Sequence, residues 1–187
     1  RDFLVPPPPM SFHKFSEEYK VHSKANKTPS SWRRDLDALN HLLRYFGDMT
    51  LREINTGHVQ RYIDNRLETG EGKKGRVQPR TIYAELSTLS AIFREAIKRE
   101  WVDRNPVRGV TKPKAETEVV RYLDGDEERR LLEHVPPSLC PVIVVAIHSG
   151  LREGEETKLT WADVKLKERV IIVRHTKVKK DRVVPMS

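Results

Sequence analysis

Residues 148–164, HSGLREGEETKLTWADV, are the stretch from which the fold and the site can be worked out. The apolar run at 141–150 precedes it and has the composition of a buried helix, so Arg152 is expected to begin near the protein interior. A buried cation without a partner is strongly destabilising. Arg152 is therefore either paired with Glu155 or a neighbour, or held ready for an anion from outside.

The charge of the chain favours a polyanionic partner. Its 187 residues include 35 Lys and Arg against 27 Asp and Glu, a formal net charge of +8. Residues 1–110 carry 20 basic and 14 acidic side chains, whereas residues 111–187 carry 15 and 13, so most of the excess lies in the first part. A basic balance of this kind is typical of proteins that bind nucleic acid.

The cysteine content and the hydropathy indicate a cytoplasmic protein. The chain has a single cysteine, Cys140, which excludes an internal disulfide and fits a reducing compartment. No signal peptide is present and no apolar run is long enough to span a bilayer, so no membrane partner is expected.

Residues 11–104 are predicted to form a domain of four helices, because apolar side chains recur there at helical spacing. The second helix is expected to follow Pro29 and to end at Gly47, the third to be capped by Thr56, and the longest to begin at Pro79. The predicted inward faces consist of aromatic and aliphatic side chains: Phe12, Phe15 and Tyr19; Trp32, Leu36, Leu39, Leu43 and Phe46; Val59, Ile63 and Leu67; and Ile82, Leu86, Leu89, Phe93 and Ala96 or Ile97.

Two proline-containing segments flank this domain, one before it and one after it. Residues 1–10 contain four consecutive prolines, which favour an extended linker. Residues 105–120 contain Pro106, Gly109 and Pro113, which prevent a continuous helix. We expect 105–120 to be an exposed connection between two domains.

Residues 121–187 are predicted to form a second domain that mixes helices and strands. Asp124 and Glu127 have the spacing of a helix cap. The run at 138–150 favours a strand by its β-branched residues and a helix by its length. Residues 167–186 contain two β-rich segments around a lysine-heavy turn, which predicts a hairpin.

Three alternative kinds of site lack support in the sequence. Glu153, Glu155 and Glu156 do not have the spacing of metal ligands, so we predict a solvated helix face and no metal site. Ser149 and Cys140 lack the partner that a catalytic nucleophile needs. The seven histidines are scattered along the chain.

The remaining candidates are cations. Arg152 follows a glycine-containing turn, and Lys177 lies in the predicted hairpin. A guanidinium matches a phosphate bidentately, whereas a lysine offers a point charge and a transferable proton. Phosphoryl transfer needs both charge stabilisation and protonation of the leaving oxygen. This argument alone favours neither of two interpretations: a phosphate site formed by the cations, or a surface hairpin that the lysines only make soluble.

The motifs around these residues resemble those of the tyrosine recombinases, the phage integrase family. SGLREGEETKLTWADV at 149–164 resembles the family's first signature box: Thr/Ser-Gly-Leu-Arg, an acidic residue three positions later, then Leu-x-Trp-x-Asp-Ile/Val. HTKVKKDRVVPM at 175–186 resembles its Thr-Lys hairpin, and RYLDGDEERRLL at 121–132 the start of its catalytic domain. Residues 81–107 are similar to the end of its core-binding domain, although Tyr83 stands where asparagine is common.

The resemblance implies a mainly α fold. A four-helix, SAM-like core-binding domain at 11–104 would contact DNA, and residues 121–187 would form the first part of an α+β catalytic domain with a small antiparallel sheet. It further implies a site-specific recombinase that works without metal or nucleotide cofactor, in the bacterial or phage-infected cytoplasm. Its partners would be double-stranded DNA and three further copies of itself, in a homotetramer.

The resemblance also implies roles for individual residues. Arg152 would clamp the scissile phosphate, Glu155 would orient Arg152 or its surroundings, and Lys177, which follows Thr176 as the family's lysine does, would be the general acid. The remaining candidates are cations expected to contact DNA: Arg33, Arg34, Lys73, Lys74, Arg76, Arg80, Lys179 and Lys180.

The family's tyrosine nucleophile has no counterpart in this sequence. All five tyrosines precede Arg152, whereas the family's nucleophile and second catalytic box follow the hairpin. Because the sequence also begins with Arg1 and not with Met, we expect it to be part of a longer recombinase and to be inactive alone. The alternative is a non-catalytic DNA-binding protein with a recombinase-like fold.

Overall fold

The computed structural model describes residues 9–72, 75–114, 121–174 and 180–186. It divides into two compact units, Arg1–Glu118 and Val119–Ser187. Each unit has a hydrophobic core of its own. No described helix combines the length and the apolar character that a membrane span requires.

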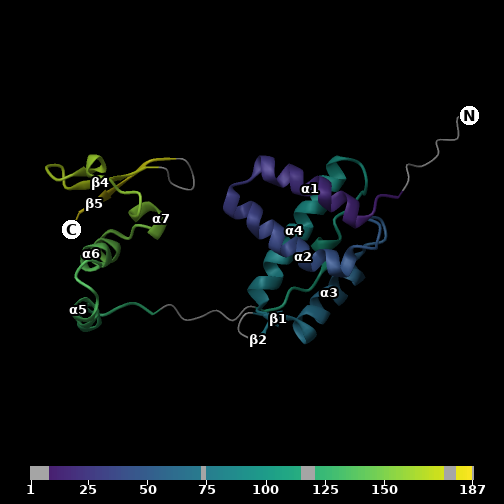
Figure 1. The fold of residues 1–187 in the computed structure, drawn as a ribbon, viewed down its shortest axis with the longest axis horizontal. Helices are drawn as coiled ribbons and strands as arrows, with labels where there is room; N and C mark the ends of the chain where they lie inside the picture. Colours follow the sequence, from purple (N-terminus) through teal and green to yellow (C-terminus); the bar gives the residue numbers. More distant parts are fainter. Residues whose placement is uncertain (1–8, 73–74, 115–120, 175–179, 187) are drawn as a thin grey trace, which may run out of the picture. The chain divides into compact units, whose positions relative to one another are not determined.

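The first unit is built mainly from helices, as predicted (Figure 1). Strands β1 and β2 pair antiparallel between α3 and α4. The elements in chain order are α1 (Phe12–Asn26), α2 (Pro29–Phe46), α3 (Thr56–Thr69), β1 (Glu71–Gly72), β2 (Gly75–Arg76), α4 (Pro79–Lys98) and the 3-10 helix η1 (Pro106–Gly109).

The helix ends follow local signals with one correction. Helix α2 begins at Pro29 and is capped by Gly47, and α4 begins at Pro79, as predicted. The cap of α3 is Asn55, so the expectation of Thr56 is wrong by one position. The Asn55 Oδ1 accepts a hydrogen bond from the His58 N–H at 3.1 Å. The longer amide side chain satisfies the free N–H groups of the first turn, which leaves Thr56 inside the helix.

The core of the first unit buries most of the side chains predicted to face inward. In α2 the buried face is rotated relative to the prediction, because it includes Asp35 while Leu36 and Leu43 are only partly buried. The buried hydrophobic residues are Phe12, Phe15, Tyr19, Leu39, Leu42, Phe46, Leu51, Ile54, Val59, Tyr62, Ile63, Val77, Ile82, Leu86, Leu89, Ile92, Phe93, Ala96, Val102 and Val107.

The expectation that 105–120 is exposed is wrong for the start of that segment. Asn105, Pro106 and Val107 are buried. The Asn105 side chain donates hydrogen bonds to the Ser90 carbonyl at 3.0 Å and to the Ser90 hydroxyl at 2.9 Å. Pro106 and Gly109 do prevent an α-helix, but they form the 3-10 helix η1, which packs against α3 and α4.

The second unit combines helices with an antiparallel sheet whose strand order is β3-β4-β5. The predicted cap is confirmed, since the Asp124 carboxylate accepts from the Glu127 N–H at 2.8 Å. The run that favoured either a strand or a helix is the helix α6. The elements are α5 (Gly125–His134), α6 (Cys140–Ser149), α7 (Glu153–Glu156), η2 (Trp161–Asp163), β3 (Val164–Lys165), β4 (Val170–Val173) and β5 (Arg182–Pro185).

The predicted hairpin strands are β4 and β5, which pair from Val170 opposite Pro185 to Val173 opposite Arg182. The predicted lysine-heavy turn falls largely on 175–179, outside the described residues. Among the described residues, the buried hydrophobic side chains of this unit are Leu151, Ile171, Val173 and Val184.

Candidate active site around Arg152 and Glu155

Arg152 is positioned by the turn that ends α6. Gly150 has φ +60°, in the left-handed region that favours glycine, and its N–H donates to the Ala146 carbonyl at 3.2 Å. Leu151 then turns into the core of the second unit. Arg152 follows as the residue before the first turn of α7.

The Glu155 carboxylate binds Arg152 at two places. Its Oε2 accepts the Arg152 backbone N–H at 3.1 Å, and its Oε1 accepts the Arg152 Nη1 at 3.0 Å. The Glu155 N–H donates in return to the Arg152 carbonyl at 2.7 Å. A carboxylate three residues into a helix reaches back to the N–H of the residue that precedes the helix, which explains the Arg-x-x-Glu spacing.

A second arginine, Arg182 of β5, binds the same carboxylate. Its Nη2 donates to the Glu155 Oε2 at 2.7 Å. Arg182 is not among the site residues predicted from the sequence, although its place in the strand pattern indicates a partner. Alternation along β5 places Arg182 on the same face as the buried Val184, so its charge needs a partner on the core side of the sheet.

The burial of this cluster is unequal. The Glu155 side chain is 7% exposed, whereas the Arg152 side chain is 72% exposed. The pKa of Glu155 is lowered to about 2, first by the Arg152 backbone N–H and next by the hydrogen bond from Arg182. The carboxylate is therefore charged at neutral pH, and the two guanidinium groups leave an excess positive charge.

The expectation that Arg152 begins near the interior is wrong. None of the residues of α6 is fully buried, and the Arg152 side chain extends into solvent. Glu155 is its partner, as one of the two sequence-based alternatives required. The guanidinium is nevertheless exposed, which leaves it accessible to an anion from outside.

The carboxylate of Asp163, at the end of the signature box, also binds an arginine of the hairpin strands. Asp163 accepts hydrogen bonds from the Thr160 hydroxyl at 2.6 Å and from the Arg174 Nε at 2.6 Å. These bonds lower the pKa of Asp163, with the Thr160 hydroxyl as the first cause and Arg174 as the second. Arg174 follows β4 and Arg182 begins β5, so carboxylates of the box bind an arginine at the end of each strand.

The sequence of residues 11–115 matches the phage integrase SAM-like domain, and residues 121–187 match the phage integrase family. This chain belongs to the phage integrase family of tyrosine recombinases. The predicted family is confirmed, and the exposed arginine and buried carboxylate described above stand in the family's first signature box.

The relatives of this integrase-family chain include recombinases from several bacteria. The shufflon-specific DNA recombinase of Escherichia coli is 29% identical over 93% of this chain and 45% of its own length. The tyrosine recombinase XerC of Actinobacillus pleuropneumoniae is 29% identical over 90% of this chain and 55% of its own length. The chain spans about half the length of the curated relatives it matches.

Two solved integrases confirm the predicted fold class. A lambda integrase dimer bound to a COC' core site superposes with a TM-score of 0.75 at 20% identity, over 95% of this chain and 49% of that one. The Tn1549 transposon integrase in complex with circular intermediate DNA gives a TM-score of 0.74 at 21% identity, over 95% of this chain and 61% of that one.

The other predicted site residues of this recombinase-family chain lie in the first unit, before β5 or outside the described ranges. Lys177, Lys179, Lys73 and Lys74 fall on 175–179 and 73–74, which the structure does not describe. The remaining predicted cations are exposed. They are Arg33 and Arg34 in α2, Arg76 in β2, Arg80 in α4, and Lys180 before β5.

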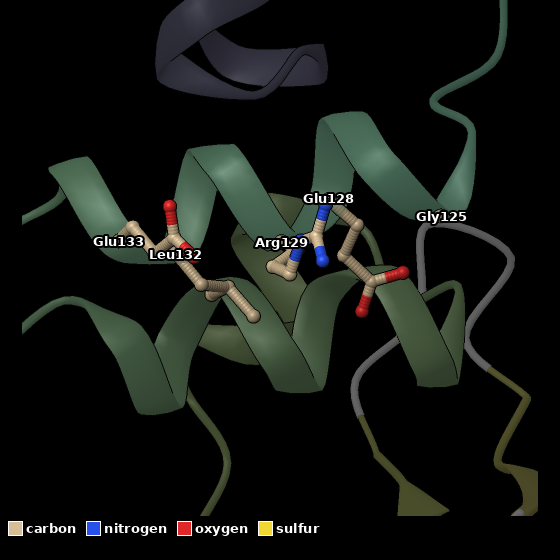
Figure 2. A pocket seen from close by; sticks show the side chains of 5 residues that line it. All are labelled: Gly125, Glu128, Arg129, Leu132 and Glu133. Carbon is tan, nitrogen blue, oxygen red and sulfur yellow. The ribbon is translucent and has the colours of Figure 1, made fainter.

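A hollow along α5 does not belong to this site (Figure 2). It is lined by Gly125, Glu128, Arg129, Leu132 and Glu133, none of which lies in the signature box. Glu128 also forms an ion pair with a histidine of α6, His148, at 3.2 Å. Within the described part of the chain, no group of three or more His, Cys, Asp and Glu side chains could hold a metal ion.

Proposed function

We propose that the whole protein is a site-specific DNA recombinase that breaks and rejoins DNA through a 3′-phosphotyrosyl intermediate. The family supports this proposal, as do relatives named recombinase or integrase and solved integrases bound to DNA. The observation that carries it is the exposed Arg152 guanidinium held by the nearly buried Glu155 carboxylate.

In this proposal Arg152 clamps the scissile phosphate. A guanidinium offers paired donors to two phosphate oxygens, and a fixed cation stabilises the negative charge that develops as the phosphate is attacked. Glu155 holds Arg152 in place, and its low pKa keeps it ionised at neutral pH. The nucleophile would be a tyrosine downstream of the hairpin, because the five tyrosines of this sequence all precede Arg152.

We assign Lys177 as the general acid. When the tyrosine oxygen bonds to phosphorus, the bond from phosphorus to the 5′-oxygen breaks, and the leaving oxygen needs a proton. A lysine ammonium supplies a transferable proton, which arginine does not. Arg174 and Arg182, held by the signature box, lie on either side of this segment in the sequence and support the assignment.

DNA recognition is assigned to both units. Residues 11–104 would form the core-binding domain, 105–120 the connection and 121–187 the start of the catalytic domain. Arg33, Arg34, Lys73, Lys74, Arg76, Arg80, Lys179 and Lys180 would contact phosphates. A solved lambda integrase tetramer bound to a Holliday junction supports a homotetramer on DNA. Relatives from bacteria and from a phage support a location in the bacterial cytoplasm.

The test compares variants of the whole protein on two substrates, one with a 5′-oxygen and one with a 5′-sulfur leaving group. Arg152→Ala should lose about 10²–10³ in cleavage rate on both substrates, because one stabilising donor is lost, while site-specific binding is retained. Lys177→Ala should fail on oxygen and recover on sulfur, because a thiolate leaves without a proton. Lys179→Ala and Lys180→Ala should lose salt-sensitive affinity and little rate.

Two outcomes would contradict the proposal. Rescue of Arg152→Ala but not Lys177→Ala by the sulfur substrate would reverse the two roles. Specific DNA binding by the whole protein without any covalent protein–DNA complex would establish the alternative, a non-catalytic DNA-binding protein with this fold.

A further inference from the structure

We infer that Arg182 is a positioning residue for Arg152 and acts through the Glu155 carboxylate that both arginines bind. The inference deepens the proposed function and rests on it, because the orientation of Arg152 affects a rate only if Arg152 meets the phosphate.

The sheet fixes where Arg182 lies. Arg182 is the first residue of β5 and is paired with Val173 of β4, two positions along the strands from the pair of Ile171 with Val184. Directly opposed residues of an antiparallel pair share a face, so Arg182 lies on the face that carries these three buried side chains. The opposite face carries the exposed Val183. From this face the Arg182 side chain, which stays 40% exposed, reaches the Glu155 carboxylate of α7.

The shared carboxylate divides its two oxygens between the arginines. Oε2 accepts the Arg152 backbone N–H at 3.1 Å and the Arg182 Nη2 at 2.7 Å, while Oε1 accepts the Arg152 Nη1 at 3.0 Å. With Oε2 held by two donors from two elements, the carboxylate has a fixed orientation. The Arg152 guanidinium is therefore held by Oε1 in one direction.

This arrangement decreases the conformational entropy that Arg152 loses when it is oriented for the reaction. A long, exposed arginine samples many rotamers, and a supporting hydrogen bond restricts them before the substrate binds. Glu155 has little contact with solvent, so water is a poor replacement for Arg182. Loss of Arg182 should leave Arg152 present and charged but less well oriented, which costs about 10- to 100-fold in rate when a catalytic group is displaced by about 1 Å.

The first test needs no catalysis and uses this chain alone. Carbon-13 NMR follows the Glu155 carboxyl during acid titration in the wild type and in Arg182→Met. We expect Glu155 of the variant to titrate at a clearly higher pH, toward the value of about 4.3 for an ordinary glutamate. Arg182→Lys should give an intermediate value, since it keeps the charge and loses the planar fork. An unchanged titration in Arg182→Met would overturn the inference.

The second test is a double-mutant cycle for DNA cleavage by the whole protein at saturating DNA. Arg182→Met and Glu155→Gln should each slow cleavage by about 10- to 100-fold with little change in DNA affinity, and their combination should be no slower than the slower single variant. A structural role for Arg182 that is independent of Glu155 would instead make the two losses multiply, which would overturn the inference. Arg182→Lys should recover part of the rate, and it also serves as the test variant if Arg182→Met does not fold.

Arg129→Met is the matched control. Arg129 forms an exposed ion pair with Asp126 at 3.1 Å, within α5 of the same unit. It should cleave at the wild-type rate. If the wild type forms no covalent complex, the proposed function fails while the titration still decides whether Arg182 controls Glu155. If the wild type cleaves and folded Arg182→Met cleaves equally fast, only the inference fails.

Discussion

The two units of the molecule use the same chemical pairing, a carboxylate with a cation, in opposite ways. In the pair of Glu85 with Arg66, in the helical unit, both partners are shielded: Glu85 is buried and the Arg66 side chain is only 11% exposed. In the second unit the carboxylates of Glu155 and Asp163 are shielded, but their arginines are not, with Arg174 51% exposed. The first unit uses the pair to join helices, and the second uses the carboxylate to hold a cation that solvent can reach.

Two carboxylates of the helical unit, Glu85 and Asp35, are surrounded by hydrogen-bond donors. The Glu85 carboxylate accepts hydrogen bonds from the Tyr62 hydroxyl at 2.6 Å and from the Arg66 Nη2 at 2.5 Å, which joins α3 to α4. The Asp35 carboxylate of α2 accepts from Ser23 at 2.6 Å and from Lys27 at 2.5 Å. Further donors to Asp35 come from α1 and α4, namely Tyr19 and Thr88. A charge enclosed this completely has no free side for a ligand.

This difference distinguishes the Arg66–Glu85 pair, whose cation is enclosed, from the Arg152–Glu155 pair, whose cation solvent can reach. A buried carboxylate with a buried cation contributes to folding specificity, and its removal is felt as lost stability. A buried carboxylate with an exposed cation stabilises the fold little through that pair, because solvent screens it. What such a pair provides is a cation held in one orientation, and Arg152 is the most exposed arginine of the three that the signature box holds.

The largest predicted effect is on the free energy of unfolding. It is tested by replacing one arginine in each unit. Arg66→Met should lower the free energy of unfolding of the helical unit by about 3–5 kcal/mol, because it leaves Glu85 buried and unpaired. Arg174→Met should cost less than about 1 kcal/mol, because its pair is half exposed and Asp163 keeps the Thr160 hydroxyl as a donor. Urea denaturation followed by circular dichroism measures both.

The control for this comparison is Arg66→Met combined with Glu85→Gln. The amide removes the buried charge and still accepts the Tyr62 hydrogen bond, so the double variant should regain part of the stability lost in Arg66→Met. If Arg66→Met and Arg174→Met cost the same, the distinction between enclosed and exposed pairs is wrong.

A second prediction concerns the pH dependence of the helical unit. Burial alone would raise the pKa of Asp35, but the hydrogen bonds from Lys27 and Ser23 outweigh it and lower the pKa below its ordinary value. A carboxyl with a depressed pKa stabilises the fold fully above its unfolded value, about 3.9, and progressively less as the pH falls through the folded value. The wild type should therefore lose stability on acidification below about pH 4.

Asp35→Asn isolates this contribution. The variant should be less stable than the wild type by about 1–3 kcal/mol at pH 7, because charged acceptor bonds are lost. The gap between the two proteins should shrink as the pH falls below about 4, because the pKa of Asp35 is lower in the folded chain than in the unfolded chain, so protonation favours unfolding. Urea denaturation at pH 7, 5, 4 and 3 gives the gap directly, and a gap that stays constant would show that Asp35 does not titrate in this range.

Local sequence signals predicted the parts of the structure that local interactions determine. Apolar periodicity gave the four helices of the first unit and their main buried faces. The cap at Asp124, the strands of the hairpin and the link between Arg152 and Glu155 follow from residues two to four positions apart. The signature box supplied the family.

The missed features depend on pairs that are distant in sequence. Asp35 belongs to the buried face of α2 because its donors include Thr88, 53 residues away. Arg182 meets Glu155 across 27 residues, by a route that runs through the sheet register. A charged residue on an apolar face indicates that a partner exists, but the topology has to be known before that partner can be named. The packing of η1 was missed for the same reason, since Ser90 is its hydrogen-bond partner through Asn105.

The smallest predicted effect tests whether exposed cations of the helical unit contact DNA, as the exposed arginine of the second unit is proposed to do. Arg76 and Arg80 are exposed where the chain enters α4. Each arginine bound to a phosphate releases about one counterion, so the slope of log affinity against log salt should become shallower by about 1 for Arg76→Ala and for Arg80→Ala. Between 50 and 200 mM salt this corresponds to a difference of about three- to fourfold in affinity.

Arg99→Ala is the matched control from the same unit. The Arg99 guanidinium already binds Glu18 at 2.9 Å and Glu95 at 3.0 Å, so it has little free charge to offer a phosphate. Fluorescence anisotropy of this chain on duplex DNA at several salt concentrations should give the wild-type slope for Arg99→Ala and a shallower slope for the other two variants. If all three variants keep the wild-type slope, Arg76 and Arg80 do not contact DNA. Equal loss of slope in Arg99→Ala would instead mean that a carboxylate partner does not prevent an arginine from binding phosphate, which would weaken the same reasoning for Arg152 and Glu155.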